Sequence, residues 1–362
     1  MAKIQSVFGA YSSKLQAVVD ASKDKFAPVW YPKYFTFGTP QMSLTYTSVL
    51  GSSRIEAAAS IISRGSSSPL RSRAALSKLA GEIPAISEKF AMSESDYRDF
   101  MTLQQLAIDD AVKKSQLLDL LFNDTKKAGD SAHKRLDMLC LEGLSTGAVT
   151  ITVDNNPDGY VSSVPLDLGM PTGNKSNAAV AWATSATAKP ITDIDGVVES
   201  AAGAGKRFAK ILMSRAVWNN FRKAKEVIDS LVSYNVLQKG ASVATLEKVN
   251  EYMDANLLPV IEIVDEQIGI EKDGIVTATK PFSQSNAVFV PDGPMGKIHH
   301  AVAIEQLKPV NQVSYADYNK ALISKWQEND PFMEFTKVEL NAFPGFDSIE
   351  GVYLLSTTVA FS

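Results

Sequence analysis

A long amphipathic pattern in the middle of the chain constrains the fold more than any other feature. Ser93-x-x-Asp96 resembles a capping box, and behind it apolar residues recur at steps of three and four residues or their multiples. The recurring residues are Leu103, Leu106, Leu117, Leu121, Ala128, Ala132, Leu136 and Leu139. A helix that ran unbroken to Gly143 would span on the order of 75 Å, although Gly129 predicts a bend or a break. The pattern predicts one long helix with an apolar face.

Two β-rich runs separated by turn residues follow the predicted helix. The first run covers Ala148–Val153, the second covers Tyr160–Leu166, and Asp154–Gly159 lies between them. The middle segment begins like a calcium-binding loop, but Pro165 stands at the twelfth position, where such a loop needs a bidentate glutamate. We therefore expect a β-hairpin here rather than a metal site.

From about residue 167 to about residue 325 the pattern changes to alternating helices and strands, which predicts a second lobe. Thr192-x-x-Asp195 is expected to open a helix, and Ser214 is expected to cap another helix that carries Trp218 and Phe221. A further helix is predicted at Thr245–Met253, and strands are predicted at Lys210–Met213, Val260–Val264, Gly274–Ala278, Ala287–Val290 and Ile298–Ile304.

The first 92 residues show few signs of a core of their own. Residues 1–34 end in the rigid, aromatic segment Pro28–Pro32, which predicts an extended arm. Residues 35–92 are rich in serine and alanine, and such a segment is either disordered or completed by a neighbouring molecule. Between positions 54 and 78 the chain has one acidic residue, Glu56, and five basic residues: Arg54, Arg64, Arg71, Arg73 and Lys78.

The C-terminal part combines a turn signal with a closing strand. Asp330-Pro331 follows Trp326, and a residue before proline is pushed out of the α region, so we expect a turn and then an extended path. Pro344 interrupts this path, and the apolar run that begins at Val352 predicts a strand at the end of the protein.

Composition excludes several classes of protein. A formal net charge of -4 argues against a protein whose main task is to grip phosphate backbones, because such domains are strongly basic. A single cysteine, Cys140, excludes an internal disulfide, and three histidines leave little for a zinc site. The sequence has no apolar run of about 18 residues and no signal-peptide core, so we expect no membrane partner and a protein made and used in a cytoplasm.

Three short motifs resemble catalytic or ligand-binding patterns, but each lacks part of its context. Gly143–Gly147 satisfies G-x-S-x-G with Ser145 as the nucleophile, yet a nucleophile elbow needs a strand before its helix, so a helix C-cap is expected instead. Gly203–Arg207 lacks the first glycine and the hydroxyl of a phosphate loop. His299 and His300 would lie on opposite faces of a strand and could not share one metal. No catalytic, cofactor-binding or metal-binding residue is nominated.

The order of these segments resembles that of a major capsid protein with the Hong Kong 97 fold. The C-terminal order is similar to that of tailed-phage capsid proteins of the lambda E type, in which W-x-E-x-D-P precedes L-P and a last strand. Leu144–Gly147 resembles their L-x-T-G motif, and Val164–Gly169 resembles their V-D-F-G motif with proline and leucine departures. The positions that carry these motifs are Gly147, Asp167, Gly169, Trp326, Asp330, Pro331 and Pro344.

The resemblance implies an α+β, Hong Kong 97-like architecture of five parts. They are an N-terminal arm (1–34), an extended E-loop that lies on a neighbouring subunit (35–92), a P-domain with a long spine helix and a β-hairpin (93–166), a mixed α/β A-domain (167–325), and a return to the P-domain with the final strand (326–362).

The resemblance also implies a function without catalysis or cofactor: the major capsid protein of a tailed double-stranded DNA bacteriophage. Its copies would assemble in the host cytoplasm into hexamers and pentamers of an icosahedral head, first as a procapsid that later expands. A separate scaffolding protein and a portal are implied partners, a decoration protein is left open, and the DNA would be enclosed without sequence-specific binding. An encapsulin-type bacterial compartment is the alternative on the same fold, and an α/β hydrolase using Ser145 is the alternative from another class.

The basic residues between 54 and 78 suggest one contact between copies. Residues 93–142 hold ten acidic residues against seven lysines or arginines, so we expect the basic segment to lie against acidic surface of an adjacent copy. Exposed ion pairs contribute about 0–1 kcal/mol each, and such a contact would rely on many repeated copies.

Overall fold

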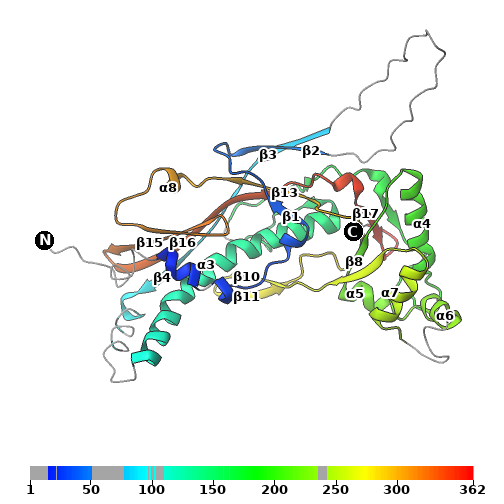
Figure 1. Cartoon of the computed structure of the whole chain (residues 1–362), viewed down its shortest axis with the longest axis horizontal. Helices are drawn as coiled ribbons and strands as arrows, with labels where there is room; N and C mark the ends of the chain where they lie inside the picture. The colour runs from blue at the N-terminus through cyan, green and yellow to red at the C-terminus, as the bar shows by residue number, and fades with distance from the viewer. Residues whose placement is uncertain are drawn as a thin grey trace, which may run out of the picture.

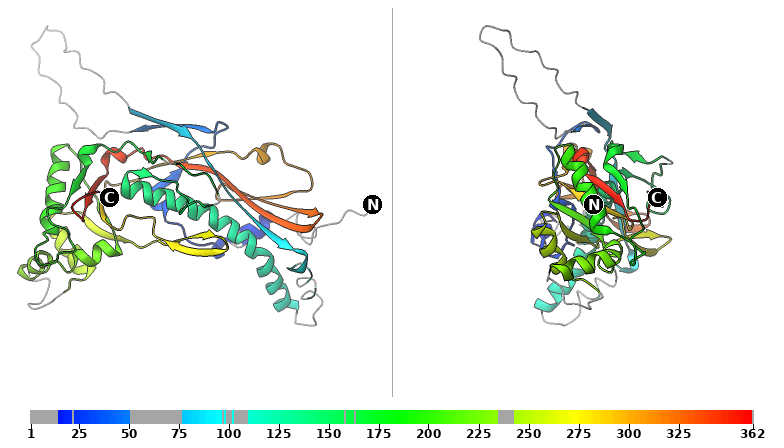
Figure 2. Two further views of the ribbon diagram at one scale, coloured as in Figure 1. Left: turned by 180° about the vertical axis from the view of Figure 1, so that it is seen from behind. Right: turned by 90° about the vertical axis from the view of Figure 1, so that its right-hand side faces the viewer.

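A long central helix organises the molecule. The computed structural model describes residues 15–21, 23–50, 77–96, 98, 102, 110–157, 159–162, 164–234 and 243–361. Helix α3 (Asp110–Thr146) is one continuous helix that includes Gly129, so the break that was one of the two expectations does not occur. The helix does change direction along its length (Figures 1 and 2). The predicted apolar residues in its second half are buried: Ala128, Ala132, Leu136 and Leu139. The side chains of Leu103, Leu106, Leu117 and Leu121 lie outside the described part.

The predicted capping box precedes this helix. Ser93 ends strand β4 (Ala85–Ser93), and its backbone N–H donates to the Asp96 carboxylate at 2.9 Å. The Asp96 N–H donates in return to the Ser93 hydroxyl at 3.4 Å, and residues 94–96 are helical. The reciprocal hydrogen bonds confirm the motif.

A six-stranded sheet packs against one face of α3. Five of its strands follow the order β1-β13-β16-β15-β14, and the sixth strand, β4, pairs with residues 333–341 of β16. The bounds of its other strands are β1 (Phe35–Phe37), β13 (Gly296–Ala301), β14 (Ser314–Tyr318), β15 (Ala321–Asn329) and β16 (Phe332–Pro344). Asp330-Pro331 forms the turn between β15 and β16, as the sequence predicts. Apolar side chains of α3, this sheet and the N-terminal arm form one hydrophobic core.

A second lobe contains a five-stranded sheet with its own core. The bounds expected for this lobe, 167–325, are too wide, because β13, β14 and the start of β15 belong to the sheet on α3. The sheet order is β7-β17-β12-β8-β9, and the bounds are β7 (Lys175–Asn177), β8 (Lys210–Ser214), β9 (Val260–Val264), β12 (Asn286–Val290) and β17 (Tyr353–Ser356). The helices of this lobe are α4 (Pro190–Gly203), α5 (Arg215–Phe221), α6 (Lys225–Ser233) and α7 (Leu246–Ala255), and Figure 2 shows them gathered at one end of the elongated molecule. Ser214 caps α5 by accepting from the Val217 N–H at 3.3 Å, which places Trp218 and Phe221 in the core.

Three local expectations differ from the structure. Strands β5 (Ala148–Val149) and β6 (Leu166–Asp167) pair over two residues each, so the predicted hairpin is much shorter than its β-rich runs. Helix α4 begins at Pro190 rather than at Thr192, because proline is well suited to the first helical turn. The segment expected to form one strand up to Ile304 instead ends β13 at Ala301 and begins the short helix α8 (Ile304–Leu307).

The last strand lies in an unexpected sheet. We predict from the sequence that it returns to the lobe of the long helix, but β17 pairs antiparallel with β12 and parallel with β7. Its apolar residues alternate between two cores, since Leu354 belongs to the core of α3 and both Tyr353 and Leu355 belong to the core of the second lobe. The C-terminal strand therefore joins the two lobes.

Besides the short β5–β6 hairpin, two further hairpins of the described chain stand outside both large sheets. Strands β2 (Thr45–Leu50) and β3 (Ser77–Glu82) pair antiparallel and stand clear of the body beyond the long sheet (Figures 1 and 2). Strands β10 (Ile268–Lys272) and β11 (Ile275–Thr279) form the second hairpin, which runs alongside α3. The N-terminal arm contains α1 (Leu15–Ala21) and the short 3-10 turns η3 (Lys23–Lys25) and η4 (Tyr31–Lys33). Within the described part of the chain, no helix is both long and apolar enough to cross a membrane.

Candidate assembly surfaces

The basic residues nominated from the sequence lie almost entirely outside the described part of the chain. Arg54, Arg64, Arg71 and Arg73 fall between β2 and β3, in residues 51–76. The backbone of Lys78 is described and pairs with Val49 in the β2–β3 hairpin, but its side chain is not. The hairpin therefore locates the two ends of the basic segment, while the contact expected for it stays a prediction.

Three of the family-motif residues shape the exit from the long helix. Gly147 has φ +78°, a left-handed conformation that suits glycine, and its N–H donates to the Gly143 carbonyl at 2.9 Å. Gly169 also has a positive φ, and its N–H donates to the Asp167 carboxylate at 2.9 Å. The helix C-cap predicted at 143–147 is confirmed, and these motif residues act on the backbone of their own chain.

The remaining motif residues belong to the β15–β16 hairpin. Trp326 packs on Phe335 with ring centroids 5.3 Å apart, and its indole N–H donates to Glu328 at 3.2 Å. Asp330 and Pro331 make the turn, and the strand β16 ends at Pro344, opposite Ile298 of β13. The sequence motif therefore marks a structural hairpin that lies over the long helix.

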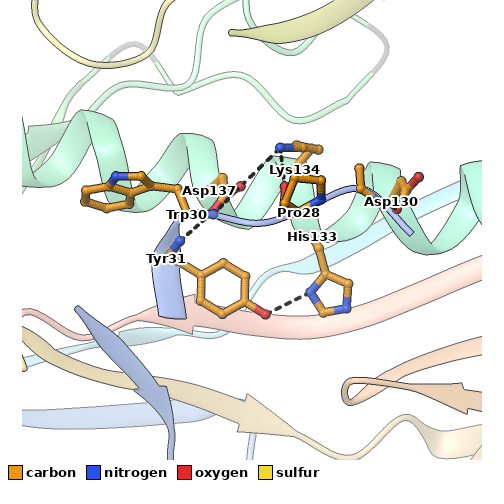
Figure 3. A network of polar contacts seen from close by, with 8 residues as sticks. Pro28, Trp30, Tyr31, Asp130, His133, Lys134 and Asp137 are labelled. Atoms are coloured by element: carbon orange, nitrogen blue, oxygen red, sulfur yellow. Dashed lines mark hydrogen bonds and ion pairs between the residues drawn. The ribbon is translucent and has the colours of Figure 1, made fainter. Parts of the chain in front are cut away.

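A polar stripe on α3 holds the N-terminal arm, and sequence reasoning missed it. Asp137 is 1% exposed, and its Oδ1 accepts from the backbone N–H groups of Trp30 at 2.9 Å and Tyr31 at 2.8 Å (Figure 3). Lys134 donates to the Pro28 carbonyl at 2.8 Å, and Asp130 accepts from the Ala27 N–H at 2.8 Å. The helix thereby supplies hydrogen bonds to an irregular segment that has no strand partner there.

Burial shifts the pKa values of two residues of this stripe, Asp137 and His133. Burial raises the pKa of the Asp137 carboxyl, while the hydrogen bonds from Tyr31 and Trp30 and the nearby Lys134 act in the opposite direction. His133 lies between two partners: its Nε2 is 3.3 Å from the Tyr318 carbonyl, and its Nδ1 is 3.1 Å from the Tyr31 hydroxyl. A carbonyl can only accept, so Nε2 carries the proton and Nδ1 accepts from Tyr31. Burial lowers the pKa of His133, which favours this neutral form.

The signal for this contact was present in the sequence as helical spacing. Asp130, His133, Lys134 and Asp137 follow one another at steps of three, one and three residues, so they share one face of the helix. The arm segment Pro28–Pro32 offers backbone donors that a proline-rich path cannot satisfy by itself. Nothing in the local pattern of either segment names the other as its partner.

The acidic residues of region 93–142 are partly occupied within the chain. Asp130 also pairs with Lys126 at 2.8 Å, Asp137 holds the arm, and the Glu142 carboxylate accepts from the Thr150 N–H at 2.9 Å. These three acids are therefore engaged near the C-terminal half of α3. At the beginning of this region Glu94 pairs with the exposed Arg98 at 2.6 Å, and the side chains of Asp99, Asp109, Asp110 and Asp119 lie outside the described part of the chain.

The base of the β2–β3 hairpin is anchored by stacked rings. Tyr46 is 3% exposed and stacks on His299 of β13, with centroids 4.8 Å apart, and on Phe343 of β16, with centroids 5.4 Å apart. The neighbouring Met42 and Leu44 are 71% and 48% exposed. The base of the hairpin is thus attached to the long sheet through Tyr46, and the exposed apolar side chains of Met42 and Leu44 lie beside this attachment.

The described residues do not assemble a catalytic centre around Ser145. Its side chain is fully buried, and its hydroxyl accepts from the Ser283 N–H at 2.9 Å and donates to the Glu142 carbonyl at 3.3 Å. His133 lies on the same helix twelve residues earlier, about 18 Å along the axis, and bonds Tyr31 and Tyr318. Among the described side chains, no group of three His, Cys, Asp or Glu is placed to hold a metal ion.

Two solved structures have the same fold along nearly their whole length. A protein assigned as a prophage capsid protein of E. coli CFT073 has a TM-score of 0.57 and 14% identity, and the match covers 95% of this chain and 98% of that one. A phage-related protein from Bordetella bronchiseptica RB50 has a TM-score of 0.51 and 10% identity, with 96% and 98% covered. No curated protein sequence matches the chain.

The sequence itself matches a family described as phage major capsid protein E over residues 19–354. The match begins in α1 and ends in β17, so it includes the arm, the long helix, both sheets and both hairpins. Together with the solved structures it confirms the predicted α+β fold of the Hong Kong 97 type. The chain belongs to the phage major capsid protein E family, whose members are structural proteins of the capsid.

Proposed function

We propose that this protein is the major capsid protein of a tailed double-stranded DNA phage and that its copies form the hexamers and pentamers of an icosahedral head. The family match over residues 19–354 carries the proposal, because it spans every element described above. The subunit shape supports it as well. The molecule is elongated, with a long helix, a long sheet beside it and a lobe at one end, and such a shape leaves much of the chain on the surface, as a shell subunit requires (Figure 2).

The β2–β3 hairpin is the proposed contact element of the shell. The hairpin stands clear of its own subunit, and the exposed Met42 and Leu44 lie next to its anchored root. Exposed apolar surface of this kind is costly in water and is typical of protein contacts. The basic residues 54–78 continue from this hairpin, and we propose that they meet the acidic residues at the beginning of region 93–142 on an adjacent copy.

The proposed partners follow from the same function. A scaffolding protein and a portal would direct assembly in the host cytoplasm, and a decoration protein would bind the finished shell. The net charge of -4 favours enclosing DNA over gripping it, since a basic surface would be needed for tight phosphate binding. Neighbouring copies that meet through different surfaces close into rings, which is how five and six copies would make one capsomer.

Size-exclusion chromatography with light scattering, followed by negative-stain microscopy, tests the proposal on the purified chain. The expected result is a population of pentamers, hexamers, tubes or closed shells that grows with protein concentration. Uniform small shells that carry an enzyme cargo would instead indicate a bacterial compartment. A chain that stays monomeric at every concentration, also with polyethylene glycol as a crowding agent, would contradict the proposal.

A further inference from the structure

The β10–β11 hairpin has an unused edge. Among the described residues, its two strands form hydrogen bonds to no third strand. Strand β10 is anchored, because Ile268 and Ile270 are buried and form a small cluster with Met138 of α3. Strand β11 is the outer strand, and its residues 275–278 are all exposed. An isolated two-stranded sheet is marginal in water, so the anchor on α3 keeps the edge in place.

The turn determines which backbone groups point outward from β11. Asp273 and Gly274 both have positive φ, at 52° and 77°, as a two-residue type I′ turn requires. Such a turn places its flanking residues, Lys272 and Ile275, in a hydrogen-bonded pair. Because pairs alternate along an antiparallel ladder, the next residue on β11 that directs its N–H and C=O away from β10 is Val276, followed by Ala278.

The edge of β11 lacks the features that keep the edge strands β14 and β4 from pairing with a further strand. The edge of β14 is covered by α1, where the Gln16 amide donates to the Asp317 carbonyl at 3.1 Å and accepts from the Asp317 N–H at 2.7 Å. Strand β4 carries the charged Glu88 and Lys89. Strand β11 has the sequence Ile-Val-Thr-Ala-Thr, without charge, proline or bulge, and Ile275 and Val276 are 70% and 65% exposed. A free edge of this composition is a template for another strand.

We propose that β11 pairs antiparallel with β11 of a second copy around a two-fold axis at Thr277. This inference rests on the proposed function, because it assigns one contact within the shell. In this register Val276 of each copy faces Ala278 of the other, so the outward N–H and C=O groups of both strands bond one another. Thr277 then faces Thr277 of the partner in a non-hydrogen-bonded pair.

Charge supports the same register. Thr277 is the centre, so Lys280 of one copy lies opposite Gly274 of the other and beside its Asp273. Both side chains are exposed, and the dyad produces this opposite-charge pair twice. Within its own chain Lys280 pairs with Asp265 at 3.4 Å, an exposed ion pair that is weak. A pairing of five-residue strands buries little surface area, so one such contact binds weakly. It would stabilise a shell because the same contact is repeated in many copies.

Cysteine cross-linking tests the register directly. Residues that face each other in a non-hydrogen-bonded pair have Cα atoms about 4.5 Å apart, within the range of a disulfide. We expect Thr277→Cys to give disulfide-linked dimers when the assembled protein is oxidised with copper phenanthroline. Ile275→Cys is the matched control on the same face of the strand, because its two copies would lie about 14 Å apart, too far for a disulfide. The native Cys140 is fully buried and should not react.

The two outcomes separate this contact from the proposed function. Shells that form without Thr277→Cys dimers, or that cross-link equally through both positions, would overturn the β11 pairing and leave the capsid function standing. A chain that forms neither oligomers nor dimers would overturn both. Val276→Pro, which removes only an outward N–H, should abolish cross-linking in the Thr277→Cys background, whereas Val276→Thr keeps that N–H and should preserve it.

Discussion

At the scale of single residues, Asp137 has the largest consequence for this fold. It lies on the long helix, yet it provides hydrogen-bond acceptors for a segment more than a hundred positions away in sequence. A buried backbone N–H without an acceptor costs about 1–3 kcal/mol. The stability of the arm thus depends in part on a carboxylate that the amphipathic pattern of the helix would place among ordinary polar positions.

We expect Asp137→Ala to lower the free energy of unfolding by about 2–4 kcal/mol, because the N–H groups of Trp30 and Tyr31 lose their acceptor. Asp137→Asn should cost less, since its amide oxygen can occupy the position of Oδ1. Urea unfolding followed by circular dichroism measures both. The control is Asp229→Ala, whose partner is the exposed Lys225 and whose expected cost is below about 0.5 kcal/mol. Equal losses for Asp137→Ala and the control would contradict this role.

His133 gives the fold a pH dependence of known sign. Its folded pKa is lowered from the ordinary 6.5, first of all by burial. The unfolded chain therefore binds more protons than the folded chain below about pH 6.5, and stability is lost as the pH falls through this value. His133→Gln can still accept from Tyr31 and donate to Tyr318, but it cannot titrate.

We therefore expect the loss of unfolding free energy between pH 7.5 and pH 5.5 to be smaller in His133→Gln than in the unsubstituted protein. Thermal or urea unfolding at the two pH values provides the comparison. The pKa values of His299 and His300 are also lowered by burial, so part of the pH dependence should persist in this variant. An unchanged difference between the two pH values would contradict this role, because it would mean that the folded and unfolded chains bind the same number of protons at His133.

At the scale of elements, Gly129 shows why a glycine can lie in the middle of a long helix without breaking it. Gly129 is helical, and a Cβ at this position would lie 2.7 Å from the Phe26 ring and 3.0 Å from the Tyr318 ring. These two rings stack on each other with centroids 3.7 Å apart. Glycine is present because the arm and β14 meet on the helix surface there, and its low helix propensity is the cost of that approach.

Two of the helical glycines, Gly129 and Gly196, offer a matched pair of substitutions. Gly196→Ala in α4 meets no atom within 4 Å, so it should raise the free energy of unfolding by about 0.5–1 kcal/mol through helix propensity. Gly129→Ala gains the same propensity but drives a methyl group against the stacked rings, and we expect a net loss of stability. Denaturant unfolding of both variants measures the two changes. An increase in the free energy of unfolding at both sites would mean that the arm moves freely on the helix.

At the scale of the whole molecule, weak contacts repeated over many copies are expected to hold the shell together. We predict that reversing two charges, in the double variant Arg71→Glu and Arg73→Glu, reduces the yield of particles while the subunits stay soluble. Exposed ion pairs contribute about 0–1 kcal/mol each, so the effect depends on repetition and should weaken at high salt. Particle yield is measured by sedimentation and negative-stain microscopy.

The matched control for this experiment keeps the charge. Arg71→Lys with Arg73→Lys should assemble nearly as well as the unsubstituted protein, because the proposed contact depends on charge in an exposed segment. Particle yield that is unaffected by the glutamate variant would refute the contact between residues 54–78 and acidic surface of a neighbour. A loss in the lysine variant as large as in the glutamate variant would point to bidentate arginine contacts instead.

Helices, caps and turns that depend on neighbouring residues could be predicted from the sequence alone. The apolar period defines the buried face of α3, Gly147 ends that helix, Ser214 caps α5, and Asp330-Pro331 turns β15 into β16. Each of these depends on residues within a few positions of one another, so hydrogen bonding and backbone sterics decide the outcome wherever the segment lies. The order of such elements was also enough to suggest the family and the fold.

Which distant segments contact one another could be seen only in the three-dimensional structure. Strand β17 could extend any sheet with a free edge, and its place beside β12 and β7 follows from the two cores that its alternate side chains fill. The same holds for the arm on Asp137 and for the β10–β11 hairpin on Met138. Strand pairing and hydrogen bonding between remote segments use groups that every residue carries, and a local pattern therefore cannot name the partner.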